Sequence, residues 1–296
     1  MPAYDDPPAP ATVTPMAPPV PWAVLAWFVA LLAFSYGRTL AAMAQEWITD
    51  DDMGHGIFVP VLAGWIVWQK RAELGQLPLR SNPWGLGLVL VGGLQLIAGT
   101  LGVEFFVART AFLVSLAGII LYLGGWVWLR ALAFPLFLLL FMIRIPAILY
   151  NQITFPLQLL ASRVAETVLW GIGIPVLREG NILELATQRL SVVEACSGIR
   201  SLLSLSFLAL IYAYMFDPKI WMRAVLLAAT IPIAIAANAF RVTMTGVLSE
   251  YQRDLATGFF HLLEGWGVFM VALVILIVTH RLLNRLHRLY AARARS

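Results

Sequence analysis

Three side chains suited to acyl-transfer chemistry stand near the ends of three apolar segments. Cys196 is the only cysteine of the chain and immediately precedes an apolar run. Arg241 lies nineteen residues after Met222, where a second run begins, and His261 lies at the start of a third. A cysteine thiolate is a nucleophile, a histidine can take a proton and return it to a leaving amine, and an arginine can hold a developing oxyanion. Together these groups would support nucleophilic cleavage of a peptide bond.

The composition indicates which kind of structure positions these three side chains. Of 296 residues, 60% are hydrophobic and only 12% are charged, and the mean hydropathy is +0.83. A soluble domain of this length needs more polar surface, so the bilayer must be the main solvent. Because an apolar helix of about 20 residues crosses a hydrocarbon core, the sequence predicts an all-α polytopic transmembrane bundle of about eight spans. The predicted spans are residues 22–42, 57–69, 84–102, 107–126, 132–149, 197–216, 222–247 and 259–279.

Two stretches between the fifth and sixth spans differ from the rest. Residues 151–174 are only moderately hydrophobic and carry four polar side chains, namely Gln152, Gln158, Arg163 and Glu166. That pattern is typical of an amphipathic helix at the membrane interface or of a segment that dips into the bundle. Whether it spans, dips or lies flat stays open. Residues 175–194 hold two short alternating stretches, 182–185 and 190–193, which predict a small extracytoplasmic hairpin-like element.

The distribution of Lys and Arg predicts the topology. If residues 151–195 do not cross, one side of the membrane carries the basic residues of three loops and of the C-terminal tail. The loop residues are Lys70, Arg71, Arg80, Arg130, Lys219 and Arg223. That side is the cytoplasm, so both termini are cytoplasmic. Cys196, Arg241 and His261 then meet at the extracytoplasmic face. The predicted organisation is a disordered tail at 1–21, one transmembrane domain at 22–280 and a basic tail at 281–296.

Each of the three residues has a purely structural interpretation as well. A lone cysteine in an apolar chain is usually a small buried hydrophobe. Arg241 could extend its charge to lipid headgroups, and His261 could be an interfacial hydrogen-bonding residue. Their agreement on one membrane face favours the chemical interpretation.

Four further residues are candidates for substrate binding or support. Arg200 lies one turn below Cys196 and would be a second cation near the thiolate, and the Ser197 hydroxyl could cap the sixth span. Asn238 lies one turn below Arg241. His55 is also predicted to be extracytoplasmic, so it rivals His261 as the general base.

The sequence predicts neither a metal nor a cofactor, because no Cys/His cluster has zinc-site spacing. The acidic run Asp50-Asp51-Asp52 is interpreted as a solvated loop. The arginines of the C-terminal tail are expected to meet anionic membrane lipids, and nucleic acid is not an expected partner.

The residues around these positions resemble the exosortase/archaeosortase family of membrane cysteine transpeptidases. The resemblance covers about residues 45–280 and lies in four motifs: Ala195-Cys196-Ser197-Gly198-Ile199-Arg200-Ser201-Leu202, Asn238-Ala239-Phe240-Arg241-Val242, Gly258-Phe259-Phe260-His261 and His55-Gly56-Ile57-Phe58-Val59-Pro60. It implies an active site of Cys196, Arg241 and His261 in a bacterial inner (cytoplasmic) membrane. It also implies substrates that are exported proteins with a C-terminal Pro-Glu-Pro-type motif, a transmembrane helix and a basic tail. Such proteins would be cleaved through a thioester and transferred to a cell-surface acceptor. Whether a separate accessory protein takes part stays open.

Two alternatives remain at this point. The chain could be a non-catalytic membrane component of exopolysaccharide export or assembly, with an inert Cys196. It could also be an intramembrane protease that hydrolyses the thioester, because hydrolysis and transpeptidation differ only in the second nucleophile. A proton-coupled transporter is disfavoured, since no predicted span carries a carboxylate at its centre.

Overall fold

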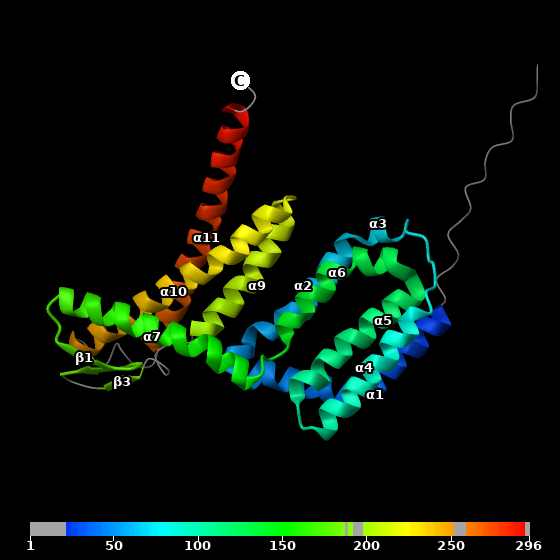
Figure 1. Cartoon of the computed structure of the whole chain (residues 1–296), viewed down its shortest axis with the longest axis horizontal. Helices are drawn as coiled ribbons and strands as arrows, with labels where there is room; N and C mark the ends of the chain where they lie inside the picture. Colours follow the sequence, from blue (N-terminus) through cyan, green and yellow to red (C-terminus); the bar gives the residue numbers. More distant parts are fainter. Residues whose placement is uncertain (1–21, 187–188, 192–197, 252–258, 294–296) are drawn as a thin grey trace, which may run out of the picture. The chain divides into compact units, whose positions relative to one another are not determined.

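Apolar helices make up most of the chain, as the composition predicts. The computed structural model describes residues 22–186, 189–191, 198–251 and 259–293 (Figure 1). The predictions for the tail 1–21, for Cys196 and for Ser197 lie outside the described residues, as do the side chains of Arg200 and His261. The elements in chain order are α1 (Trp22–Thr49), η1 (Asp51–Ile57), α2 (Phe58–Gln69), α3 (Arg71–Leu74), α4 (Trp84–Leu101), α5 (Phe105–Ala131), α6 (Ala133–Leu138), η2 (Leu139–Met142), α7 (Ala147–Gly171), β1 (Val176–Glu179), β2 (Ile182–Leu185), β3 (Arg189–Ser191), α9 (Gly198–Phe216), α10 (Ile220–Tyr251) and α11 (Phe259–Arg293).

The helices confirm a polytopic membrane protein. In the described part of the chain, α1, α4, α5, α10 and α11 are long and apolar enough to cross a membrane, and the broken pair formed by α6–η2 and α7 brings the number to six. The predicted count of about eight also includes α2, which has 12 residues, and α9, of which the stretch Leu202–Phe216 is a shorter apolar helix within the residues that this number covers.

The predicted fifth span is not continuous, so this part of the prediction is wrong. The chain leaves the helical conformation after η2 and resumes it only at α7. Pro146 occupies the N-cap of α7 with an extended ψ of 138°. A proline also disfavours a helical conformation in the residue before it, which explains a helix boundary at this position. Residues 151–171 therefore continue a helix that starts at Ala147 and packs against α10.

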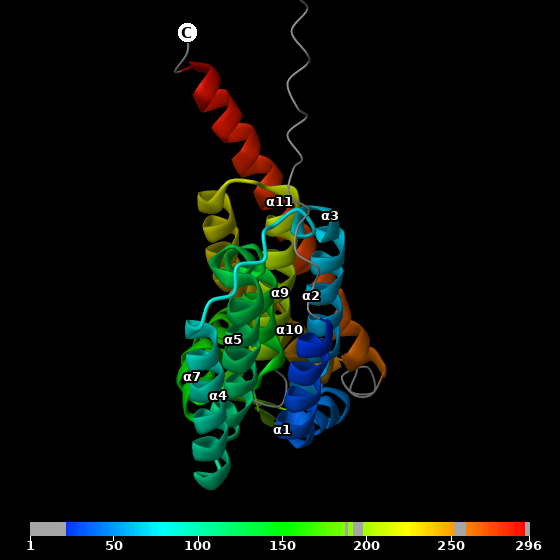
Figure 2. The same ribbon diagram turned by 90° about the vertical axis from the view of Figure 1, so that its right-hand side faces the viewer.

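The described residues form two compact units. One contains the described residues of Met1–Ala42 and Pro60–Leu140, and the other those of Met43–Val59 and Phe141–Ser296. In the first unit α4 and α5 lie side by side, as Figures 1 and 2 both show. Gly85, Gly92 and Gly99 recur every seven residues on the buried face of α4. A Cβ at Gly92 would collide with the Ser115 hydroxyl of α5, so small residues permit this close approach.

The second unit contains two buried clusters that the candidate site depends on. One lies among α9, α10 and α11. The other joins α7 and α10 to a three-stranded antiparallel sheet of order β1-β2-β3. The pairing of β2 with β3 confirms the predicted hairpin-like element. Leu183 and Leu190 are partners in this register and both are buried, which gives the sheet one apolar face.

The close approach at Gly92 allows the α4–α5 packing to be tested. Gly92→Leu should destabilise the protein, because the side chain meets Ser115, whose hydroxyl lies 2.7 Å from that of Tyr36. Overpacking of this kind typically costs about 1–3 kcal/mol. Gly93→Leu is the matched control, since a Cβ at Gly93 has no atom within 4 Å. Thermal denaturation in detergent should show a lower midpoint for Gly92→Leu alone. Equal midpoints for the two variants would contradict this packing.

Candidate functional site

The helices α9, α10 and α11 pack together, and α10 carries Arg241 while α11 carries His261. Only three residues, Asp217 to Lys219, connect α9 to α10, and the two helices pack against each other. α11 in turn packs against α10. The first turn of α9, the last turns of α10 and the first turn of α11 therefore share one end of this unit.

A hydrogen bond between α9 and α10 fixes how far Arg241 lies along the unit. The hydroxyl oxygens of Ser206 and Thr230 are 3.1 Å apart, so these two residues stand at one level. Gly198 is eight residues before Ser206, and Asn238 is eight residues after Thr230. At about 1.5 Å per residue, both lie about 12 Å from the hydrogen bond in the same direction. Arg241 follows Asn238 by three residues, or about one turn.

A contact between α9 and α11 fixes the level of His261 in the same way. Oδ2 of Asp217 and Nε2 of His280 are 3.1 Å apart. Gly198 is nineteen residues before Asp217, and His261 is nineteen residues before His280. Because α9 and α11 run in the same direction, each helix rises about 28 Å to reach these positions. The backbone of His261 therefore lies level with the start of α9, two residues after Cys196 in the chain.

The segment of α10 that carries Arg241 is held from the side by α7 and the sheet. Ala239 and Val242 belong to the same buried cluster as Leu169 of α7 and Leu183 of β2. Asn238 is also buried, with 8% of its surface exposed. On the next turn, the Thr245 hydroxyl donates a hydrogen bond to the Arg241 carbonyl at 3.0 Å. Helix α7, whose placement the sequence left open, and the sheet thus support the turns of α10 on either side of Arg241.

His55 lies at a different level from the other candidates. Its Nε2 donates a hydrogen bond to the Phe141 carbonyl at 3.1 Å, and its ring centroid is 6.3 Å from that of Phe207 on α9. Phe207 is nine residues beyond Gly198, so it lies about 14 Å along the helix from the start of α9. Burial lowers the pKa of His55, against the opposing influence of the Phe141 carbonyl and of Asp52.

The residue after His55 explains why this motif has a structural role. A Cβ at Gly56 would overlap the Trp47 indole, so only glycine lets the indole pack here. Trp47 Nε1 donates a hydrogen bond to the Met142 carbonyl at 2.9 Å, just before the chain breaks. The His55-Gly56 pair therefore joins η1 to the segment that precedes α7.

The acidic run is not a simple solvated loop, so that interpretation is wrong. The Asp50 carboxylate accepts the backbone N–H of Asp52 at 2.8 Å, which caps η1, and forms an ion pair with Arg144. The Asp52 carboxylate accepts the Tyr150 hydroxyl at 3.1 Å. Two of the three aspartates therefore tie η1 to the beginning of α7.

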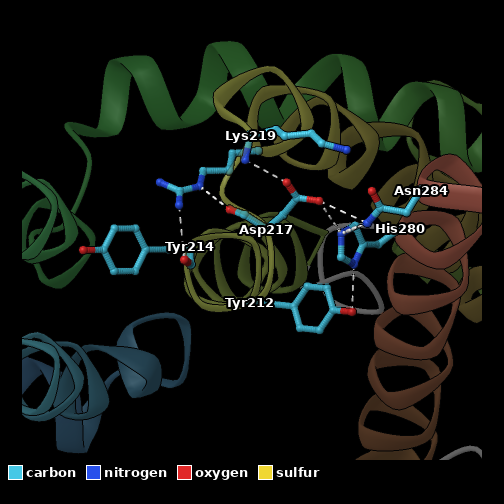
Figure 3. Close-up of polar contacts among 7 residues, drawn as sticks. Tyr212, Tyr214, Asp217, Lys219, His280 and Asn284 are labelled. Carbon is cyan, nitrogen blue, oxygen red and sulfur yellow. Dashed lines mark hydrogen bonds and ion pairs between the residues drawn. The ribbon is translucent and has the colours of Figure 1, made fainter. Parts of the chain in front are cut away.

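The sequence also missed a buried polar network at the other end of α9 (Figure 3). Asp217 is 3% exposed and His280 is 5% exposed. Nδ2 of Asn284 donates to Oδ2 of Asp217 at 3.1 Å, and the Tyr212 hydroxyl lies 2.9 Å from Nδ1 of His280. Because a carboxylate oxygen can only accept, Nε2 of His280 is the donor to Oδ2 of Asp217 at 3.1 Å. No local pattern in the sequence links Asp217 to His280, because 63 residues separate them in the chain.

Hydrogen bonds determine the charge of the carboxyl in this network. Burial by itself raises the pKa of Asp217, but the Lys219 N–H, His280 and Asn284 together outweigh burial and hold that pKa below its ordinary value. Asp217 is therefore an anion at neutral pH. Within the described ranges, no group of three or more His, Cys, Asp or Glu side chains is arranged to hold a metal ion.

Comparison with known proteins gives one match. The family model described as transmembrane exosortase (Exosortase_EpsH) matches residues 47–278, which include the segments of Cys196, Arg241 and His261. No curated protein and no solved structure matches the chain. The matched region is about three quarters of the 296 residues and contains η1, the sheet and the whole of α9 and α10. The chain belongs to the transmembrane exosortase family.

Proposed function

We propose that this exosortase-family protein is a membrane-embedded cysteine transpeptidase that cleaves the C-terminal sorting signals of exported proteins. Cys196 is the nucleophile, His261 the general base and acid, and Arg241 the group that stabilises the oxyanion. The substrates carry a Pro-Glu-Pro-type motif followed by a transmembrane helix and a basic tail. The site faces the extracytoplasmic side of a bacterial inner membrane, with both chain termini in the cytoplasm.

One observation carries this proposal. Two independent contacts, Ser206 with Thr230 and Asp217 with His280, put the Arg241 segment and the His261 backbone at the level where α9 begins. Cys196 precedes that helix by two residues in the chain. A cysteine near a helix N-terminus is favoured as the thiolate, because the helix dipole and nearby cations lower its pKa. Arg200 follows Cys196 by four residues in the chain and is the second cation of this proposal.

The reaction follows from these roles. His261 takes the Cys196 proton, and the sulfur forms a bond with the scissile carbonyl carbon while negative charge develops on the carbonyl oxygen near Arg241. The carbon–nitrogen bond then breaks, and His261 returns the proton to the leaving amine. The product is a thioester on Cys196. An amine of the acceptor, deprotonated by His261, attacks this thioester and restores the thiol, and water in its place gives hydrolysis.

The reaction also requires a particular position of the substrate. The substrate helix must lie beside the bundle so that the peptide bond near its motif meets the end of the unit where α9 begins. The apolar faces of the described helices suit a transmembrane helix as partner, and the acceptor must approach from the aqueous side of the same membrane face.

Substitution of the three residues tests the mechanism. Cys196→Ala should abolish processing of a co-expressed signal-bearing substrate, and Arg241→Ala and His261→Ala should each reduce its rate by at least about 100-fold, as the loss of one catalytic group commonly does. The exposed Arg163 on α7 provides the control variant Arg163→Ala, which should process normally. Immunoblots of substrate length give the measurement. Full processing by Cys196→Ala would leave the non-catalytic component of exopolysaccharide export as the better account.

The two histidines can be separated by glutamine substitution. His55→Gln retains an N–H that can donate to the Phe141 carbonyl, so processing should stay within about threefold of the wild-type rate. His261→Gln removes the titrating imidazole and should lose at least about 100-fold. A larger loss for His55→Gln than for His261→Gln would transfer the role of base to His55.

Thiol labelling in intact cells tests the membrane orientation. A membrane-impermeant maleimide should modify Cys196 from outside, or leave it protected by burial, and should never modify it only after the cytoplasm is opened. The control is Arg285→Cys in a Cys196→Ser background, because Arg285 is exposed and near the C-terminal end of α11. Its cysteine should react only after permeabilisation. Labelling of Cys196 exclusively from the cytoplasmic side would overturn the orientation.

A further inference from the structure

Residues of α9 and α11 that are 63 apart in the chain recur along buried faces of the two helices. Asp217 and His280, which are in contact, are separated by 63 residues in the chain. Ala213 and Leu276 have the same separation and lie one turn nearer the candidate site, and Ala209 and Ala272 lie one turn nearer again. All four of these apolar residues are buried in one cluster. Because both helices step by about four residues per turn on this face, the cluster continues the register of the polar contact.

The apolar part of this interface does not by itself select the register. Contacts among Ala209, Ala213 and Ala272 are non-directional and nearly interchangeable, so a slip by one turn would bury a similar area. The polar contact is different, because a hydrogen bond has a direction and a buried carboxylate must be paired. A slip would leave the Asp217 anion buried without His280 and Asn284. A single buried polar contact can fix a helix register in this way.

Asp217 also connects this register to the third helix. Its Oδ1 accepts the Lys219 N–H at 2.8 Å, immediately before α10 begins, while its backbone carbonyl accepts Nε of Arg223 at 2.8 Å (Figure 3). A second nitrogen of Arg223 donates to the Tyr214 carbonyl at the end of α9. One residue thus contacts the end of α9, the start of α10 and the middle of α11.

We propose that Asp217 and His280 are positioning residues that set the register of α11 against α9. The consequence at the active site, which rests on the proposed function, is that the contact determines the level of His261 relative to Cys196. Cys196 precedes Asp217 by 21 residues in the chain, and His261 precedes His280 by nineteen. A slip of one turn at Asp217 would move His261 by about 5 Å along the bundle. The proton transfer from the thiol requires a separation near hydrogen-bonding distance, so the chemical step would fail first.

The register can be measured without any activity. In a Cys196→Ser background, the pair Ala209→Cys with Ala272→Cys tests the observed register, and Ala209→Cys with Leu276→Cys tests a register shifted by one turn. Each pair is oxidised in native membranes, and the disulfide is quantified by mass spectrometry of the digest. With Asp217 and His280 intact, the first pair should form about fivefold more disulfide than the second, since a slip breaks the buried pair.

Three variants then alter the contact. His280→Leu should bring the ratio between the two cysteine pairs close to one, whereas His280→Gln, which keeps an N–H for Asp217, should restore most of it. His287→Leu is the matched control. His287 lies on the same helix, and its ring packs near Trp221 rather than on Asp217. It should leave the ratio unchanged. If the His280→Leu protein does not accumulate in the membrane, the double variant Asp217→Asn/His280→Leu replaces it. This variant removes the buried charge together with its partner and should also lower the ratio.

The outcomes separate this inference from the proposed function. An unchanged ratio in His280→Leu and in the double variant would overturn the register role. With native Cys196, His280→Leu should lower kcat for substrate processing by at least about tenfold while KM changes little, and His280→Gln should recover the rate. A lowered ratio with normal kcat would overturn the connection to the active site. A lowered ratio together with no processing by the wild-type protein would refute the proposed function and leave the register inference in place.

Discussion

A carboxylate buried between apolar helices is stable only where hydrogen bonds replace its hydration, and this requirement at Asp217 organises the α9–α10–α11 unit. The anion receives hydrogen bonds from the Lys219 backbone, from His280 and from Asn284, and so draws on residues from the α9–α10 turn and from α11. Few other arrangements of these helices would satisfy it. The helix levels that follow from this contact, and from the Ser206–Thr230 hydrogen bond, bring the start of α9, the Asn238–Arg241 turn and the start of α11 together. The polar contact thus lies at the end of α9, the start of α10 and the middle of α11, and the Arg241 segment and the His261 backbone lie several turns away from it.

The remaining parts of the second unit support the candidate end from outside. The buried faces of α7 and the sheet pack on Ala239 and Val242, next to Arg241. The η1 segment joins the start of α7 through Asp50, Asp52 and His55. An arginine at the rim of a membrane bundle needs a rigid setting to hold a developing charge, since a mobile guanidinium would lose the benefit of preorganisation. The small sheet and α7 hold the turns of α10 on either side of Arg241.

The sequence predicted those features that depend on local composition. Long apolar runs predicted α4, α5, α10 and α11, and alternating residues predicted the strands at 182–185 and near 190, because each pattern follows from the period of its own element. The break before α7 was missed, although Pro146 gives a local signal, because residues 132–149 are apolar throughout. The Asp217–His280 network could not be predicted, since the two residues belong to different segments 63 residues apart and each has an ordinary local explanation. Residue type and order led to the prediction of Cys196, Arg241 and His261, whereas the levels of the Arg241 segment and of the His261 backbone followed only from two long-range contacts.

The most direct test of this account is the distance between the native thiol and the other two positions. Cys196 paired with His261→Cys, and separately with Arg241→Cys, can be oxidised in membranes and compared with Cys196 paired with Leu276→Cys. We predict efficient disulfide formation, or cross-linking by a short bifunctional thiol reagent, for the first two pairs. The third pair should form no cross-link, because Leu276 lies about 22 Å further along α11 than His261. Absence of a cross-link to both 261 and 241, with a thiol that still reacts with small reagents, would contradict the account.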